Sequence, residues 1–347
     1  MPLLFTRSSM VFRLSRIDNS QKRYFLFTGV LVVIALLVSL RVGRYPLSLG
    51  DIGAIIFGGE IPPLSRGVFL SLRLPRSLMA LLAGAGLGLA GSVFQLVFKN
   101  PLASPDIMGA ASGANLGAAL AIVVFGQTAS LMAFSAFLGC ILVVFLVISL
   151  AKLARNNSTV TFILAGIIMK AVSDAVIMIL KFYADPEREL AAIEYWAMGS
   201  LGSITSTKVL AILPFYLAGF AGLIIMRRHI TVLGLEDDES RALGMNVKRV
   251  RVIVLAFASL TVASIICQTG LIVFIGLIAP HVARLALKRI SFAWCVLSAM
   301  TGALIMLIAD CLARSLYSSE IPISILTTFI GVPVLVYFMI SRKAGKI

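Results

Sequence analysis

Residues 252–280 read VIVLAFASLTVASIICQTGLIVFIGLIAP, an apolar run that is too long for one ordinary membrane helix. A helix needs roughly 17 to 25 apolar residues to cross a bilayer, so the run is either one over-long helix or two short ones. Gln268 and Gly270 interrupt it near the middle and mark a natural break. The choice decides between nine and ten spans.

The distribution of basic residues favours two helices here. With ten spans, both termini share one side with twenty of the 30 Lys and Arg residues, nine lie on or near the other side, and Lys170 lies within a span. With nine spans, the last six basic residues would move to the opposite side. Because cytoplasmic loops are enriched in Lys and Arg, the sequence predicts ten spans with both termini cytoplasmic.

The overall composition indicates a chain embedded in lipid. Of the 347 residues 60% are hydrophobic and 13% are charged, a balance that is not typical of soluble domains. Backbone groups must be paired inside hydrocarbon, and these runs are too long for barrel strands, so we expect an all-α integral membrane protein.

The net charge of +15 fits membrane orientation, and no soluble segment is long enough to bind nucleic acid. The four cysteines lie in apolar runs without paired spacing, which indicates neither disulfides nor a zinc site.

We expect a single transmembrane domain over residues 1–347, with a basic cytoplasmic N-terminus at 1–23 and a cytoplasmic loop at 227–251. The first apolar run has no cleavage site behind it and is expected to remain as a helix. Besides 252–280, the apolar windows lie near 24–42, 77–97, 108–125, 130–151, 160–183, 206–226, 292–313 and 323–340.

Glycines recur at helical spacing in two of these windows. They are Gly84, Gly88 and Gly91 in the second, and Gly109, Gly113 and Gly117 in the third. Small residues on one face let helix backbones approach closely, and lipid supplies no hydrophobic drive for association. This pattern therefore predicts helix packing.

Two polar segments are expected to be ordered on the cytoplasmic side. Residues 99–106 contain two prolines and predict a stiff turn. In residues 234–251, the acidic run 236–239 suits the start of a short helix, Gly244 suits a left-handed cap, and Asn246 can cap the next helix. From these residues alone, an ordinary ordered loop and a partner-docking surface are equally supported.

Charged residues within spans are candidates for function because burying them is costly. Lys170 and Asp174 lie four residues apart in the 160–183 window, and Asp310 and Arg314 repeat that spacing at the end of the 292–313 window, the ninth span. Each pair is either mutually neutralised or turned to a polar path or surface. The chain has only 2 histidines, which argues against a metal site at His281. We therefore expect His281 to have a hydrogen-bonded structural role.

The chain has no phosphate-binding loop of the G-x-x-x-x-G-K-[ST] type and no hydrolase motif in a suitable context. We therefore expect no enzymatic activity in this chain. Any ATP hydrolysis must occur on another subunit.

Several sequence blocks in the same order resemble the permease subunits of type II ATP-binding-cassette (ABC) importers, which carry iron-siderophores, haem and vitamin B12. The resemblance runs from about residue 46 to the C-terminus. Its blocks are Arg73-Leu-Pro-Arg76, Asn100-Pro-Leu-Ala-Ser-Pro105 with Gly109, Trp196-Ala-Met-Gly-Ser-Leu201, Ala242-Leu-Gly244, Phe274-Ile-Gly-Leu-Ile-Ala-Pro-His281, Ala309-Asp310 with Arg314, and Glu320-Ile-Pro322.

The resemblance implies a ten-helix subunit that forms a homodimer in the inner membrane, with the translocation pathway between the copies. It further implies two ATPase subunits that use ATP with Mg²⁺, a periplasmic or lipid-anchored solute-binding protein, and no cofactor or metal bound by this chain. The implied sites are binding-protein docking at Arg73, Arg76 and Arg314, a cytoplasmic gate at Asn100, Leu102, Thr159 and Val160, and ATPase coupling at Asp238, Arg241, Ala242, Leu243 and Gly244.

A short basic link after His281 and the Lys170/Asp174 pair depart from the usual family pattern, which leaves the substrate open. We rank a ferric siderophore ahead of haem, cobalamin or molybdate. Because the family's fifth helix borders the pathway, Lys170 and Asp174 are pathway candidates. The alternatives are an ion-coupled secondary transporter that uses Lys170, Asp174 and Asp310 as relay groups, and, last, an intramembrane enzyme.

Overall fold

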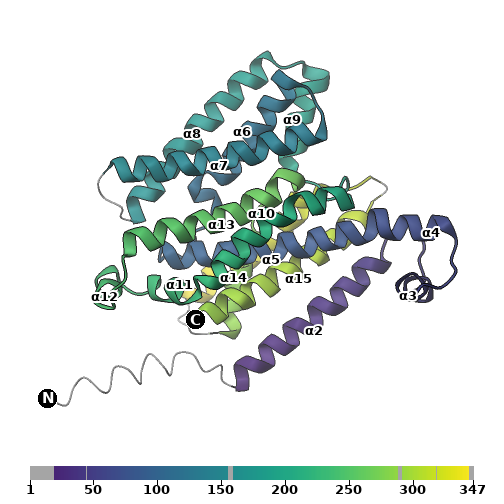
Figure 1. Ribbon diagram of the computed structural model, residues 1–347, viewed down its shortest axis with the longest axis horizontal. Helices are drawn as coiled ribbons and strands as arrows, with labels where there is room; N and C mark the ends of the chain where they lie inside the picture. The colour runs from purple at the N-terminus through teal and green to yellow at the C-terminus, as the bar shows by residue number, and fades with distance from the viewer. Residues whose placement is uncertain (1–18, 44, 155–158, 288–290, 318, 344–347) are drawn as a thin grey trace.

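The computed structural model describes residues 19–43, 45–154, 159–287, 291–317 and 319–343, and every regular element within these ranges is helical (Figure 1). The long helices are α2 (Asn19–Arg41), α5 (Leu74–Val97), α7 (Ala129–Leu153), α8 (Thr159–Tyr183), α10 (Ser206–Ile225), α13 (Val247–Thr269), α15 (Phe292–Ser315) and α16 (Ile323–Lys343). The shorter α-helices are α3 (Leu49–Phe57), α4 (Pro63–Val68), α6 (Ala110–Leu120), α9 (Ala191–Met198), α11 (Arg227–Leu233), α12 (Asp237–Ala242) and α14 (Ile275–Ala286). One-turn elements are η1 (Phe69–Arg73), η2 (Pro105–Met108), η3 (Ala121–Phe125) and η4 (Pro186–Leu190).

The predicted break in residues 252–280 is confirmed. Helix α13 ends at Thr269, Gly270 follows with a φ of 70°, and α14 begins at Ile275. This φ is positive, and a residue with a side chain would adopt it only at a conformational cost. A Cβ there would also overlap the carbonyl of Trp196. The break is therefore fixed by backbone geometry and by close packing.

Each predicted apolar window is occupied by helix, but the helices differ in length. Seven of the described helical segments are long and apolar enough to cross a membrane, and three shorter apolar segments occupy 110–125, 275–286 and 323–338. An all-helical membrane protein is therefore confirmed. The count of ten crossings and the side on which the termini lie remain predictions.

Helix α5 lies at the centre of the molecule and packs against α15, α14, α13 and α2. Its glycine face is in direct backbone contact with neighbours: a Cβ at Gly84 would overlap the carbonyl of Gly302, and one at Gly91 would overlap that of Gly276. The predicted packing role of these glycines is confirmed. The side chains of α5 are consequently among the most buried in the protein.

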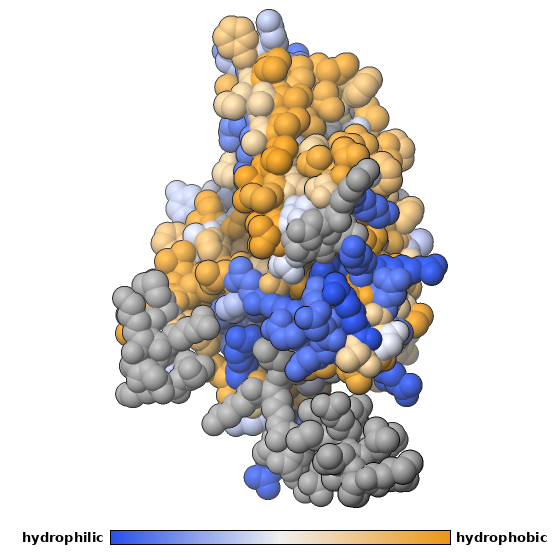
Figure 2. Space-filling model, turned by 90° about the vertical axis from the view of Figure 1, so that its left-hand side faces the viewer, coloured by the Kyte–Doolittle hydropathy of each residue, from blue (hydrophilic) through white to orange (hydrophobic). Residues whose placement is uncertain are grey.

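Helices α6, α7, α8 and α9 form a second layer above the α5 group in Figure 1, and α7 packs across α13. The other glycine series serves this layer, because a Cβ at Gly113 would lie 2.6 Å from the carbonyl oxygen of Gly139. Gly109 has a φ of 70° and begins α6. Figure 2 shows hydrophilic residues gathered at the end of the molecule where α11 and α12 lie, beside extensive apolar surface.

We predict that Gly91→Ala will destabilise the protein by about 1–3 kcal/mol, because the new methyl group must displace the backbone of α14. Gly53→Ala in α3 is the matched control, since a Cβ there meets nothing within 4 Å. Thermal unfolding of the purified chain in detergent measures the difference. Equal melting temperatures for the two variants would contradict the close α5–α14 contact.

Candidate functional site

A buried charge cluster joins α5, α15 and the segment between α15 and α16. Arg76 Nε donates to Asp310 Oδ1 at 2.8 Å, and its Nη1 donates to Glu320 Oε1 at 2.7 Å. Arg314 Nη2 lies 3.2 Å from Asp310 Oδ2. Of the two alternatives for Asp310 and Arg314, the structure shows mutual pairing, and Asp310, which is fully buried, also pairs with Arg76.

The other contacts of the arginines hold the end of α2. Arg314 Nη2 donates to the carbonyl of Ser39 at 2.7 Å and to its Oγ at 2.6 Å. Arg73 donates to the carbonyls of Leu40, Arg41 and Tyr45. Helix C-termini leave carbonyls unpaired and carry partial negative charge, so guanidinium groups suit this position.

The structure thus brings Arg73, Arg76 and Arg314 together, as expected of residues with a shared role. All three are buried and engaged within the chain, with exposed fractions of 4%, 8% and 7%. Their contact with a binding protein remains a prediction. The most exposed member of the cluster is Glu320, whose side chain is 36% exposed.

The segment after α11 forms the predicted short helix, glycine and second helix. Helix α12 begins with a capping box between Glu236 and Glu239, and Gly244 has a φ of 81°. Asn246 Oδ1 accepts from the backbone N–H of Arg249 at the start of α13. The predicted caps are therefore confirmed.

The predicted coupling residues lie on and just after α12. Asp238 and Arg241 form an exposed ion pair at 3.2 Å, with side-chain exposures of 94% and 57%. Leu243 is 57% exposed, and Ala242 and Gly244 are exposed beside it. The charges and the leucine are free to contact a partner, although docking itself remains a prediction.

The predicted gate residues occupy the turn after α5 and the first turn of α8. Asn100 Oδ1 accepts from the N–H of Leu102 at 2.9 Å, which stiffens the turn. Leu102 and Val160 are 65% and 63% exposed, and Thr159 is the first residue of α8. The turn is ordered as predicted, and its role as a gate remains a prediction.

Lys170 and Asp174 form an ion pair at 2.5 Å near the middle of α8. The predicted pairing is confirmed. Their side chains are 57% and 44% exposed, so the pair lies on the outer surface of this chain. Since charged groups within a span avoid lipid, the exposed pair favours a polar environment beside this face of α8.

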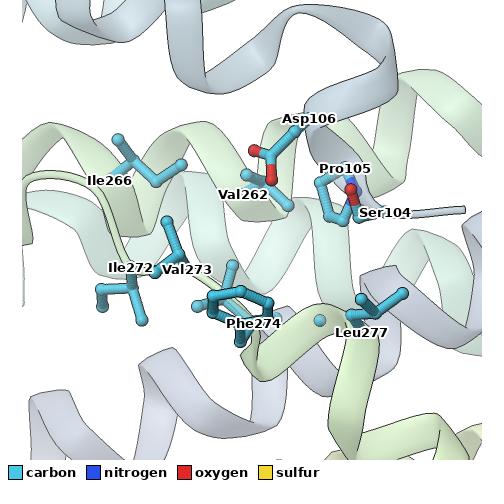
Figure 3. A pocket seen from close by; sticks show the side chains of 11 residues that line it. Ser104, Pro105, Asp106, Val262, Ile266, Ile272, Val273, Phe274 and Leu277 are labelled. Carbon is cyan, nitrogen blue, oxygen red and sulfur yellow. The ribbon is translucent and has the colours of Figure 1, made fainter. Parts of the chain in front are cut away.

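Asp106 is a candidate that the sequence reasoning missed. It lies in η2 and lines a pocket of about 250 Å³ with residues of α13 and the start of α14. Figure 3 shows its carboxylate pointing into the pocket toward Val262. The side chain of Asp106 is nevertheless exposed in the single chain. The signal available in the sequence was a carboxylate directly after Pro105, at the end of the proline-containing turn.

Two further helices, α8 and α16, pack against the segments that line the pocket. Residues of η2 rest on α8, because a Cβ at Gly166 would overlap the carbonyl of Ile107. Phe274 rests on α16, where a Cβ at Gly331 would lie 2.9 Å from that of Phe274. His281, in α14, contacts the carbonyl of Leu277 through Nδ1 at 2.7 Å and the ring of Phe338, as expected of a structural residue.

These features define a polytopic helical membrane protein with a charged cluster near one end, an ordered polar helix at the other, and an acidic pocket between. The chain belongs to the FecCD transport family, whose model matches residues 31–341. It is therefore a permease of the ABC importer class that carries metal chelates or similar substrates.

Relatives with different substrates are similar over nearly the whole chain. The molybdate import system permease protein MolB of Haemophilus influenzae is 35% identical, with 94% of this chain and 98% of the relative covered. The ferric enterobactin transport system permease protein FepG of Escherichia coli is 35% identical, with 93% and 98% covered. The hemin transport system permease protein HmuU of Yersinia pestis is 30% identical, with 92% and 96% covered.

A solved structure shows the same fold. It is described as an inward-facing conformation of a metal-chelate type ABC transporter, and it matches with a TM-score of 0.80 at 34% sequence identity. The alignment covers 91% of this chain and 99% of that chain. The match supports the sequence-based resemblance in both fold and class.

We predict that Asp310→Ala will lower stability by about 3–5 kcal/mol, because it leaves Arg76 and Arg314 buried without their shared carboxylate. Asp174→Ala removes an exposed carboxylate and is expected to cost less than about 1 kcal/mol. Thermal unfolding in detergent compares the two. A loss at Asp310 as small as that at Asp174 would show that the cluster contributes little to stability.

Proposed function

We propose that this chain is the inner-membrane permease of an ABC importer that moves a ferric siderophore by alternating access. Two copies would form the pathway, two ATPase subunits would bind the α12 ends and hydrolyse ATP with Mg²⁺, and a periplasmic or lipid-anchored binding protein would deliver the substrate. In this arrangement the chain crosses the membrane ten times with both termini cytoplasmic. The observation that carries the proposal is the full-length likeness to a metal-chelate ABC transporter.

The charges near α8 support a position beside the pathway. A Lys170–Asp174 pair that faced lipid would carry a desolvation cost, whereas an aqueous path between two copies removes it. Asp106, which is exposed on η2 where η2 packs against α8, adds a further carboxylate.

Uptake by proteoliposomes tests the proposal. We expect uptake only when the chain is combined with its ATPase, its binding protein and ATP, and we expect ferric enterobactin to be carried in preference to hemin, cobalamin or molybdate. The matched control replaces ATP with a non-hydrolysable analogue. Uptake by this chain alone, driven by a proton or sodium gradient, would instead support the ion-coupled secondary transporter.

We further propose that Arg73, Arg76 and Arg314 receive acidic residues of the binding protein. Arginine suits this role because its guanidinium group binds carboxylates in a bidentate manner. In the structure Glu320 accepts a hydrogen bond from the Arg76 guanidinium group, so an incoming carboxylate would compete with Glu320 for Arg76. The partial exposure of Glu320 makes this exchange possible without disrupting the buried Asp310.

Glu320→Gln is therefore expected to strengthen docking of the binding protein on the order of fivefold, or about 1 kcal/mol, because Arg76 loses a charged competitor. Glu194→Gln is the matched control, since Glu194 forms an exposed ion pair with Lys181 at 2.7 Å. Binding is measured at low ionic strength, where exposed charges act most strongly. Equal affinities for both variants would contradict docking through Arg76.

A further inference from the structure

Asp237 joins three segments of the chain, one of them 138 residues away in sequence. It is the first residue of α12, and its Oδ1 accepts from Lys99 Nζ at 2.8 Å. Arg251, near the start of α13, donates through Nη2 to Oδ1 at 2.9 Å and to Oδ2 at 3.0 Å. One carboxylate therefore connects the polar helix with the turn after α5 and with the start of α13.

This contact differs from an ordinary surface ion pair. The side chain of Arg251 is 1% exposed, so its charge depends on partners within the protein. Burial alone would raise the pKa of Asp237, but the hydrogen bonds and charges of Lys99 and Arg251 bring it below its usual value. The start of a helix also favours a carboxylate. Asp237 is thus held ionised at neutral pH.

Lys99 leads directly into the turn that was predicted to form the gate. Its φ of 49° is left-handed, a conformation that a lysine adopts at a cost and a glycine adopts freely. The next residue, Asn100, donates its N–H to the carbonyl of Gln95 at 3.1 Å. The residue that contacts Asp237 is therefore joined directly, through the backbone, to Asn100 and Leu102 of the turn.

The opposite surface of α12 is available to a partner. Ser240 Oγ donates to the carbonyl of Val232 at 2.8 Å and ties α12 to α11, while Asp238 is exposed on the outside. The helix thus has an inner side bonded to the rest of its chain and an outer side that carries the exposed Asp238–Arg241 ion pair. Between this outer side and the turn after α5 lie only α12 itself and the Asp237–Lys99 contact.

We propose that Asp237 is a positioning residue that couples movement of α12 to the 99–104 turn. This inference rests on the proposed function, in which the ATPase binds α12. It assigns to one ion-paired carboxylate the mechanical connection between ATP hydrolysis and the gate.

The test uses the complete transporter in proteoliposomes and measures the amount of substrate carried per ATP hydrolysed. The probe is whichever of ferric enterobactin, hemin, cobalamin and molybdate the wild type transports. We expect Lys99→Gln and Asp237→Asn each to lower this ratio about tenfold, within the range of coupling between linked sites, while ATP hydrolysis continues. The double variant should carry as much substrate per ATP hydrolysed as Asp237→Asn alone, because both changes break the same contact.

Two further variants separate coupling from folding. Lys99→Arg keeps the charge and is expected to retain most of the ratio, and Lys152→Gln, an exposed residue at the end of α7, should leave it unchanged. If Asp237→Asn does not assemble, the Lys99 variants alone decide the test. A normal ratio in Lys99→Gln, or additive losses in the double variant, would overturn the proposal. Failure of the wild type to carry any probe would instead count against the proposed function.

Discussion

The close contact of α5 with its neighbours is the constraint on which the structure depends. In a bilayer, lipid tails are as apolar as leucine side chains, so helices associate through packing and polar contacts. Gly84, Gly88 and Gly91 bring α5 against the backbones of α15 and α14, where a side chain would not fit. This central helix then fixes the positions of the polar groups at both of its ends.

Those polar groups mark the two ends at which we propose that partners bind. Arg73 and Arg76 lie at the beginning of the α5 segment and hold the end of α2, Asp310 and Glu320. Lys99 follows its last turn and contacts Asp237 of α12. One rigid helix therefore connects the proposed docking site of the binding protein with the proposed docking site of the ATPase. This arrangement suits a protein whose energy source is another subunit.

The second layer contributes the polar surface that we place beside the substrate path. Helix α8 presents the Lys170–Asp174 pair outward, and η2, which packs on α8, directs Asp106 into its pocket. The surrounding pocket wall is mostly apolar. A few charges on an apolar surface can orient a large chelate without binding it tightly, as a transporter requires. The differing substrates named for the relatives are consistent with a fold whose specificity depends on such local residues.

Local physical chemistry determined much of this protein from its sequence. Apolar run length and backbone pairing gave an all-helical membrane fold, Gly270 gave the break after α13, and the order of acidic, glycine and asparagine residues gave α12 and its caps. The i,i+4 spacing also gave the Lys170–Asp174 and Asp310–Arg314 pairs, because such residues share a helix face. Only the tertiary structure decided that Arg76 and Arg314 share Asp310, that Asp106 enters a pocket, and that Asp237 joins Lys99 and Arg251. These contacts link residues up to 234 positions apart, and their geometry depends on how whole helices pack.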